Sequence, residues 1–495
     1  MNAAYVWIGV AIYVILSLFL AYYSRTGKAK DMTDYFLGNR MMGGVVSALS
    51  YSATTFSAFM LVGLAGLTYA GGVGALGFEL IYFAGVSLIA FFGPRYWIVG
   101  KKYGYVTPTE MLGDRYDSKA VAVITAIASC IFLIPYSAVQ LTGVGYLLSS
   151  LSNNVITFTT GVTIATVLAI VFTIIAGIRS VMWTDAFQAL IMIITATLVV
   201  LVVISRLGGF GTFFETLSTE HPGSLTVPGT GYFSFPVFLS LTLPWLFFSI
   251  SNPQVSQRLF IPKSYKSLRT MLIGFLLFGF VYTLVAILWG FSARIQFPNL
   301  DNPDLATPTL LASDLVPPIL AIIVMIGIMA AAISTIDSII LTLSSMVARD
   351  VYGNTKRKPD DKHQLMFGKI VIPIISVLAY LFAQLQLDLI AVLSVSASAG
   401  LLVIVPAYIA SFFWKRGTAA GVIASVVISG AFVAYLELTK FKPLGYGSGL
   451  WGLLLAIVIF VGVSLVTNPP KDKAEEFIEF TKSEIKKLYQ KNGMV

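Results

Sequence analysis

An apolar segment around residue 337 carries a stripe of oxygen-bearing side chains. Residues three and four positions apart share one face of a helix. In MAAAISTIDSIILTLSS, residues 329–345, that spacing is followed by Ser334, Asp337, Ser338, Leu341 and Ser345, with Thr335 and Thr342 beside them. Carboxylate and hydroxyl oxygens suit Na⁺ or a proton relay better than a transition metal, and neither His nor Cys joins them. Hydroxyls alone would fit a hydrogen-bonded seam between helices, but an Asp among them favours an ion or proton site.

A second carboxylate, Asp185, lies in RSVMWTDAFQAL, residues 179–190, close to one end of another apolar run. A carboxylate at membrane depth is costly unless it faces a cavity or a partner. Asp185 and Asp337 fall in the same half of the expected membrane, at depths that would let them meet. Glu79 and Glu437 lie near the ends of their segments, where interface water is expected to solvate them.

Two further segments combine polar side chains with signs of a broken helix. SYSATTFSAFMLVG, residues 50–63, carries six hydroxyls in an apolar setting, at Ser50, Tyr51, Ser52, Thr54, Thr55 and Ser57. PWLFFSISNPQVSQR, residues 244–258, contains Pro253, which lacks a backbone donor. Non-helical backbone inside a membrane is tolerated only where it lines a cavity or is buried in protein. Both segments therefore predict interrupted helices beside a ligand site.

The composition predicts an all-α polytopic membrane protein. Of 495 residues, 57% are hydrophobic and 11% are charged, whereas soluble domains carry roughly 25% charge. A membrane span needs about 20 apolar residues. Thirteen runs qualify: about 5–23, 43–69, 77–98, 120–150, 155–178, 181–205, 235–257, 270–293, 315–347, 366–385, 388–411, 418–436 and 449–467. No small-residue cleavage site follows the first run, so we expect a retained helix. Cys130 is the single cysteine, which excludes an internal disulfide.

The basic residues predict the orientation of these spans. With the N-terminus outside, all but four of the 32 Lys and Arg residues fall in cytoplasmic segments, Arg258 among them. This distribution follows the positive-inside rule, so the net charge of +9 indicates topology and not a nucleic-acid partner. We expect a transmembrane domain over residues 1–470 and a charged cytoplasmic tail over 471–495. The tail fits either a short helix at the inner membrane surface or a frayed, solvated end.

The order of the spans predicts an internal repeat. Residues 43–205 and 235–411 each contain five expected spans, and each set begins with an interrupted one. Because five is odd, the two sets cross the membrane in opposite directions. Interrupted helices at matching places of an inverted repeat are typical of transporter binding sites.

These segments resemble the sodium:solute symporter family, which includes proline, pantothenate, monocarboxylate and sodium–glucose transporters. The resemblance covers nearly the whole chain and rests on DYFLGNR (34–40), SALSYSATTFSA (47–58), GIRSVMWTDAFQ (177–188), SNPQVSQR (251–258) and AAISTIDSIILTLSSMVARDVY (331–352). It implies a five-plus-five inverted repeat of the LeuT type, with one helix before it and two after. The segment GPRYWIVGKKYGYVTPTEMLGDRY (93–116) looks closer to the pantothenate and monocarboxylate branch.

The resemblance also implies ion sites. Matching the motifs places the family's sodium site at Ala53, Phe56, Ala331, Ser334 and Thr335. A second sodium position of some relatives maps onto Asp185, Ser334, Asp337 and Ser338. Asp337 stands where those relatives have a hydroxyl, so this site could hold Na⁺ more tightly or carry a proton. Thr55 stands where proline transporters have Asp, which weakens the proline interpretation.

The solute is expected beside the two broken helices. The candidate residues there are Thr54, Thr55, Ser57, Tyr136, Gln140, Trp245, Ser249, Asn252 and Pro253. No basic residue is expected deep in any span. An anionic solute would therefore need backbone N–H groups at a broken helix, together with Na⁺, for charge balance.

We therefore expect a Na⁺-coupled symporter of the cell membrane that imports a monocarboxylate, pantothenate or an amino acid such as proline by alternating access. Its expected partners are Na⁺, the solute and membrane lipid. One alternative is a proton-coupled symporter that uses Asp185 and Asp337. A membrane sensor on a transporter fold is another, but the short expected tail leaves no room for an output domain. An enzyme is not expected, because His221 and His363 fall in loops.

Overall fold

The computed structural model describes residues 2–24, 31–355 and 359–491. Within these ranges all secondary-structure elements are helices, apart from one isolated β-bridge between Met42 and Pro262. Parts of two expected loops, 25–30 and 356–358, and the last residues of the expected tail, 492–495, lie outside the described residues.

The described residues contain 11 helices long and apolar enough to span a membrane, or 13 spans with two bent pairs included. The thirteen expected spans are therefore confirmed. The unbent spans lie in α1 (Ala3–Ser24), α5 (Gly74–Tyr103), α7 (Lys119–Leu151), α8 (Phe158–Arg206), α12 (Tyr265–Gln296), α14 (Pro318–Met346), α15 (Asp361–Ala383), α16 (Ile390–Leu401) with α17 (Val405–Phe413), α18 (Ala419–Thr439) and α19 (Ser448–Val466).

The two bent pairs occur where the sequence predicts interrupted helices. Helix α3 (Gly44–Thr55) stops, and the chain resumes in a π-helical turn at Phe59–Leu64 and in α4 (Ala65–Gly71), with a 48° bend. Helix α10 (Phe235–Ser251) is followed by α11 (Pro253–Ser256) and a 3₁₀ turn at Gln257–Phe260, with a 40° bend. Pro253 starts α11, a position that needs no backbone donor.

Helix α8 contains two spans separated at Gly177. This glycine has φ +59°, a conformation that residues with a Cβ rarely adopt. A Cβ there would also lie 3.1 Å from the ring of Tyr35. Gly177 therefore divides the run into spans over Phe158–Ile175 and Gly177–Arg206, close to the two predicted runs.

Short helices connect the spans. They are α2 (Met32–Leu37), α6 (Pro108–Arg115), α9 (Gly209–Glu220) and α13 (Ala306–Ala312). The hydroxyl of Thr107 accepts a hydrogen bond from the Glu110 N–H at 3.0 Å and so caps α6; such a side chain satisfies one of the free donors at a helix start.

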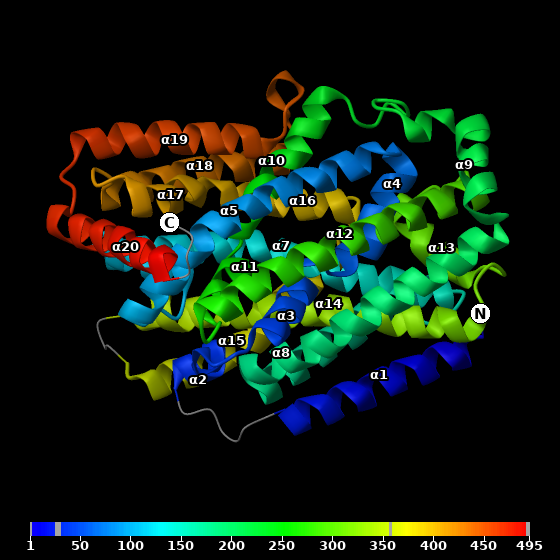
Figure 1. Ribbon diagram of the computed structural model, residues 1–495, viewed down its shortest axis with the longest axis horizontal. Coiled ribbons are helices and arrows are strands. Elements are labelled where there is room, and N and C mark those ends of the chain that lie inside the picture. Colours follow the sequence, from blue (N-terminus) through cyan, green and yellow to red (C-terminus); the bar gives the residue numbers. More distant parts are fainter. Residues whose placement is uncertain (1, 25–30, 356–358, 492–495) are drawn as a thin grey trace.

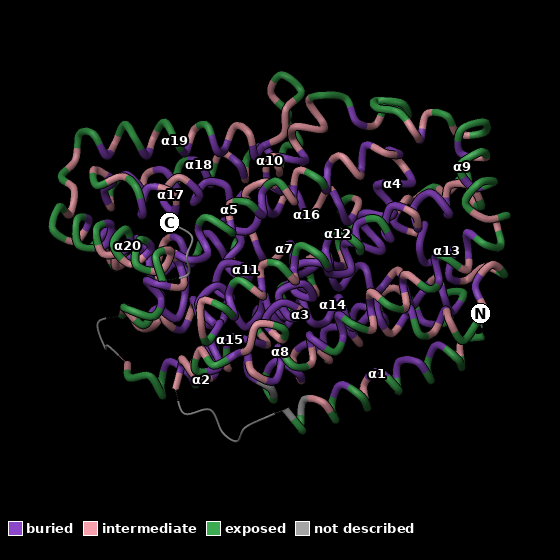
Figure 2. The backbone as a smooth tube through the Cα atoms, in the orientation of Figure 1, coloured by how far each residue is buried: buried purple, intermediate pink, exposed green. Residues whose placement is uncertain are grey.

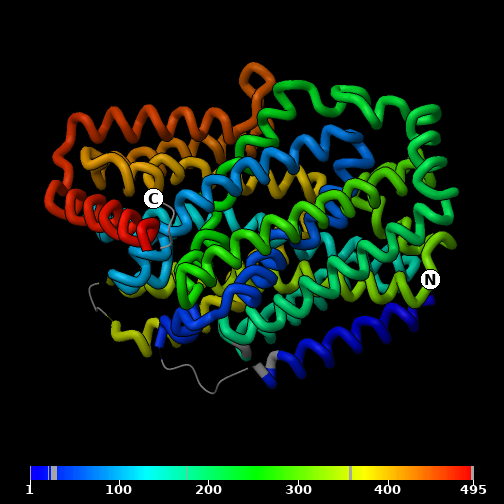
Figure 3. Tube along the Cα trace, viewed as in Figure 1, coloured from blue at the N-terminus to red at the C-terminus, as the bar shows by residue number. Residues whose placement is uncertain are grey.

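The long helices run roughly side by side, with the two broken ones near the centre (Figure 1). Helix α3 from the first predicted repeat packs against α12 from the second, and α14 packs against α8. Helices of the two predicted repeats therefore lie side by side across the bundle (Figure 3). Burial is concentrated on these central helices, whereas α1 and α19 at the two edges expose one side (Figure 2). Exposed apolar residues such as Phe19, Ile374 and Val458 fit a perimeter that faces lipid.

The expected tail forms a helix, α20 (Lys471–Lys491), so a frayed end is wrong for the described part. Phe477 is fully buried and stacks on Tyr103 with ring centroids 5.8 Å apart. The Lys415 ammonium lies 2.9 Å from the Glu475 carboxylate. The apolar side of the helix thus packs on the ends of α5 and α17.

Candidate functional site

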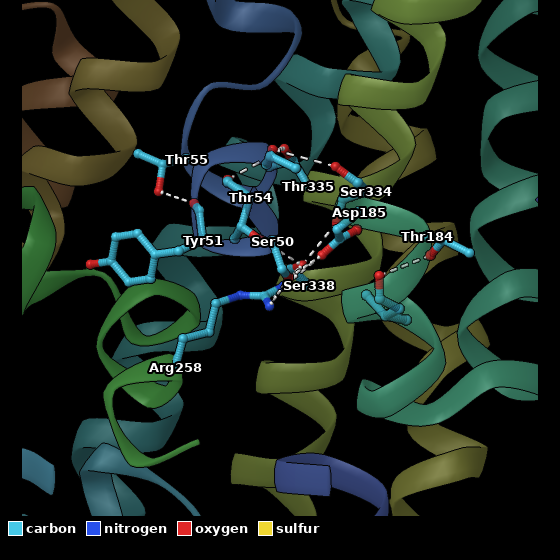
Figure 4. Close-up of polar contacts among 12 residues, drawn as sticks. Ser50, Tyr51, Thr54, Thr55, Thr184, Asp185, Arg258, Ser334, Thr335 and Ser338 are labelled. Carbon is cyan, nitrogen blue, oxygen red and sulfur yellow. Dashed lines mark hydrogen bonds and ion pairs between the residues drawn. The ribbon is translucent and has the colours of Figure 1, made fainter. Parts of the chain in front are cut away.

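Four of the predicted sodium-site residues lie together where the break after α3 meets α14 (Figure 4). The Ser334 hydroxyl donates to the Ala53 carbonyl at 3.3 Å and to the Ala331 carbonyl at 3.2 Å. The Thr335 hydroxyl lies 3.1 Å from the Ala53 carbonyl, 3.0 Å from that of Ala331 and 3.3 Å from that of Thr54. All of these residues are buried. They form a compact group of backbone and hydroxyl oxygens between two helices.

The break explains why backbone oxygens are available there. Helix α3 ends at Thr55 because Phe56 leaves the helical region, at φ −91° and ψ 72°. The last carbonyls of a helix have no partner within it, so they can bond to α14. The fifth predicted residue, Phe56, lies at this break, and its ring stacks on Phe275 with centroids 5.1 Å apart. No hydrogen bond links its carbonyl to α14 among the described residues.

Arg258 lies beside this group and forms a buried ion pair with Asp185. The guanidinium is 3.1 Å from the Asp185 carboxylate and donates to the Ser50 hydroxyl at 2.6 Å and to the Ser338 hydroxyl. Ser50 in turn donates to Asp185 at 2.7 Å. Thr54 shares a hydrogen bond of 3.0 Å with Ser338. These side chains therefore connect four elements: α3 of the first bent pair, the end of the second bent pair, α8 and α14 (Figure 4).

Arg258 was expected in a cytoplasmic loop, and that prediction is wrong, because Arg258 lies within the second bent pair and is buried. Arg258 follows Pro253 within the bent pair and is only 2% exposed. The apolar run was expected to end near residue 257, but the chain continues inside the protein to Phe260. Hydropathy placed Arg258 in a loop because its side chain is charged. The bend instead turns this short helical piece inward, where Arg258 is buried.

Asp337 has a different partner from Asp185. Its carboxylate accepts a hydrogen bond from the Thr173 hydroxyl of α8 at 3.0 Å and forms no ion pair within the described ranges. The structure thus brings Asp185 and Ser338 together with Arg258, while Asp337 points to another part of α8.

The far end of the stripe on α14 forms a seam between helices. Thr342 donates to the Gln257 side-chain oxygen at 2.7 Å, and the Gln257 amide donates to Ser345 at 3.0 Å. Hydrogen bonds of this kind commonly join membrane helices. At this end of the stripe the structure therefore shows the hydrogen-bonded seam that was the alternative to an ion site.

A buried cavity lies on the other side of the first break, between α5 and α10. The free space inside it is about 10 Å³, room for about one water molecule. Eight buried residues line it: Thr55, Phe56, Phe59, Met60, Glu79, Tyr82, Trp245 and Phe248. Its position beside both broken helices makes it the candidate solute site.

Two of the nine predicted solute residues, Thr55 and Trp245, line this cavity. Tyr136 lies behind it, with its ring 6.0 Å from that of Phe248. Gln140 and Ser249 are buried, and in sequence they are close to Tyr136 and Phe248. Their side chains have no hydrogen-bond partner among the described residues.

The remaining four predicted solute residues have structural partners elsewhere. Thr54 bonds to Ser338. The Ser57 hydroxyl accepts from the Phe59 N–H at 3.2 Å, which caps the resumed helix. The Asn252 amide lies 3.5 Å from the Ser398 hydroxyl, and Pro253 begins α11.

Glu79 and most of the aromatic lining were not among the predicted solute residues. Glu79 was expected to meet interface water, but it is 1% exposed and accepts a hydrogen bond from the Trp245 indole at 3.2 Å. A signal was present in the spacing: Glu79 and Tyr82 are three residues apart on α5, as Trp245 and Phe248 are on α10. Such pairs share a helix face.

A model of the sodium:solute symporter family matches residues 35–429. The chain belongs to this family. It is 26% identical to the sodium/pantothenate symporter of Escherichia coli (strain K12), over 89% of this chain and 92% of the relative. It is also 26% identical to a sodium/proline symporter of Staphylococcus aureus, over 96% of this chain and 94% of that protein.

Solved structures show the same fold. A Na⁺-coupled sialic acid symporter superposes with a TM-score of 0.80 at 20% identity, over 94% of this chain and 98% of that one. Mhp1, a nucleobase-cation-symport-1 family transporter, gives a TM-score of 0.57 at 14% identity, over 92% and 99% of the two chains. The expected LeuT-type architecture is confirmed, and this symporter-family member is a multi-pass protein of the cell membrane.

Proposed function

We propose that this protein is a Na⁺-coupled symporter that imports a small organic solute by alternating access. One observation carries the proposal: the Ala53 and Ala331 carbonyls and the Ser334 and Thr335 hydroxyls gather at a helix break. Hard oxygen ligands without His or Cys favour an alkali cation over a transition metal. Family membership and the Na⁺-coupled relatives support the same ion.

Sodium would act by joining α14 to the broken helix. In the proposed site the oxygens of the two hydroxyls coordinate the ion, and each hydroxyl proton donates to another acceptor. A bound ion shifts a conformational equilibrium only by its differential affinity for the two states. We propose that it favours the outward-open state, in which the neighbouring solute cavity is complete. A membrane potential of about 100 mV adds about 2.3 kcal/mol for each charge moved inward.

The proposed direction of import follows from the expected orientation, with the N-terminus outside and α20 in the cytoplasm. In that orientation Asp185 and Arg258 lie on the cytoplasmic side of the sodium group. We propose that the guanidinium supplies the resident positive charge for Asp185, so a second Na⁺ is not needed there. Asp337, which has only a hydroxyl partner in the described structure, is the proposed second ion or proton site.

Solute uptake into proteoliposomes tests this function. Proline, pantothenate and monocarboxylates are screened under an imposed Na⁺ gradient and, separately, under a proton gradient without Na⁺. The double variant S334A/T335A should raise the Na⁺ concentration for half-maximal uptake at least tenfold, because both hydroxyl ligands are lost.

Ser344→Ala is the matched control. Ser344 is buried on the same helix, and its hydroxyl donates to the Leu341 carbonyl at 2.9 Å, so its loss leaves the sodium group intact. Sodium dependence that is unchanged in the double variant would contradict the site.

A proton-coupled symporter is the second candidate function, favoured by the buried position of Asp337, which is 5% exposed. It predicts uptake driven by a proton gradient in the absence of Na⁺. That uptake should be abolished in Asp337→Asn and retained in S334A/T335A.

A further inference from the structure

The cavity beside the first break has one carboxyl group in its wall. Glu79 is its single ionisable carboxylate, and no Lys, Arg or His lines the cavity. Its carboxylate accepts a hydrogen bond from the Trp245 indole and forms no ion pair within the described ranges. An uncompensated charge inside a protein is costly, and such a carboxyl stays protonated unless a cation joins it, so a cationic partner in the cavity would stabilise its ionised form.

The rest of the lining is suited to a cation of low polarity. The ring of Trp245 lies 5.0 Å from Phe59 and 5.1 Å from Phe248, and Tyr82 lies 5.8 Å from Phe248, all between centroids. Aromatic faces attract alkylammonium groups, and Trp and Tyr do so more strongly than Phe. An enclosure of several rings with one carboxylate is therefore complementary to a substituted ammonium.

The buried Arg258 does not alter the charge of this cavity. The Arg258 guanidinium is engaged by Asp185, Ser50 and Ser338, on the α14 side of the broken helix. It is absent from the cavity lining. A solute whose only charge is a carboxylate would find no lining cation there, and the ionised form of Glu79 would repel it.

We propose that the transported solute carries an amine or ammonium nitrogen, which binds between the aromatic rings of the cavity with Glu79 as its counter-ion. This inference rests on the proposed symporter function and narrows its solute class. The free space between the rings is about 10 Å³ in this conformation, room for about one water molecule, so the site must widen to admit even a small solute. Amino acids and organic ammonium ions share the required group, whereas pyruvate and pantothenate lack it.

Uptake by proteoliposomes under one fixed Na⁺ gradient tests the inference. The panel contains proline and alanine as zwitterions, choline as a pure cation, and pyruvate and pantothenate as anions without an amine. We expect at least one amine solute to be taken up or to inhibit uptake, and both anions to be inactive. Zwitterions that outperform choline would identify an amino-acid carrier, and the reverse an organic-cation carrier; both results support the inference.

Glu79→Gln provides the residue test, because glutamine keeps the shape and an acceptor for Trp245 but removes the charge. The KM for the amine solute should rise at least tenfold, while the Na⁺ concentration for half-maximal uptake changes less than twofold. Glu437→Gln is the control: Glu437 lies on α18 and accepts from the Ser448 hydroxyl, outside the cavity. If E79Q folds poorly, Tyr82→Phe and Trp245→Leu replace it, and only the loss of the indole ring should raise the KM strongly.

Three outcomes would overturn the inference: uptake confined to pyruvate or pantothenate, no response to any amine solute, or an unchanged KM for the amine in E79Q and W245L. Failure of the proposed sodium coupling would give a different result from failure of the amine inference. Amine uptake driven by protons without Na⁺ would reject sodium coupling and leave the amine inference standing, whereas Na⁺-driven uptake of pyruvate alone would do the opposite.

Discussion

Arg258 and Asp185 form a fully enclosed ion pair, with a guanidinium nitrogen 3.1 Å from a carboxylate oxygen and side chains 3% and 1% exposed. The arginine comes from the second broken helix and the aspartate from α8. Together with Ser50 on α3 and Ser338 on α14, the pair joins four elements just beside the proposed sodium group. It therefore links residues of the two predicted repeats beside the proposed sodium group.

Removing one partner of this pair should destabilise the protein far more than removing both. Asp185→Asn or Arg258→Met leaves one buried charge without a partner, which typically costs about 3–5 kcal/mol. The double variant D185N/R258M removes both charges and should recover most of the loss. Thermal denaturation in detergent measures the effect. Lys415→Ala, which breaks an exposed pair with Glu475, is the control and should leave the melting temperature nearly unchanged. Additive losses in the double variant would contradict the coupling.

Gly85 sets the distance between α5 and α10, the two helices that supply Glu79 and Trp245. A Cβ at Gly85 would lie 2.1 Å from the Leu246 carbonyl oxygen, so Gly85→Ala must push the helices apart. We expect a loss of about 1–3 kcal/mol, as for other overpacked sites, with reduced solute affinity. Gly77→Ala on the same helix meets only Phe238, at 3.5 Å, and should be neutral or stabilising. Equal melting temperatures for the two variants would show that the contact is not limiting.

The sequence predicted the fold well because its main signals are local. Apolar run length predicted the spans, and Pro253 and the hydroxyl-rich segment predicted both breaks. The grouping of Ser334 and Thr335 with Ala53 depended on the family resemblance. The burial of Arg258 and Glu79 could not be read from hydropathy, because it depends on how a bent helix turns and on which face of α5 meets α10.

Asp304 should give the protein a pH-dependent stability. It lies between two spans, is 2% exposed and accepts from the Ile390 N–H at 2.8 Å. Burial raises the pKa of Asp304 to about 7, although the Ile390 hydrogen bond opposes the shift. The folded protein therefore holds this proton more tightly than the unfolded chain, whose aspartates have a pKa near 3.9.

The sign follows from that difference. The stabilising contribution of Asp304 is complete below about pH 4 and is lost as the pH rises through about 7, with a slope of up to about 1.4 kcal/mol per unit. Asp304→Asn resembles the protonated form and should flatten this part of the stability curve, measured by denaturation between pH 4 and 8. The control is Asp301→Asn at an exposed neighbouring position. An identical pH slope in D304N and wild type would rule out Asp304 as its source.

Helix α20 should stabilise one end of the bundle through Phe477. This side chain is fully buried between Tyr103 and Phe412, with ring centroids 5.8 and 5.6 Å away. Removing a buried phenylalanine side chain typically costs about 3–5 kcal/mol, but here the loss can be limited to local detachment of α20. We therefore expect Phe477→Ala to increase amide hydrogen exchange throughout α20 while exchange in α14 stays unchanged. Lys487→Ala, on an exposed part of the same helix, should leave exchange as in wild type. If exchange in α20 of F477A matched wild type, the helix would be held by its ion pairs and not by this aromatic contact.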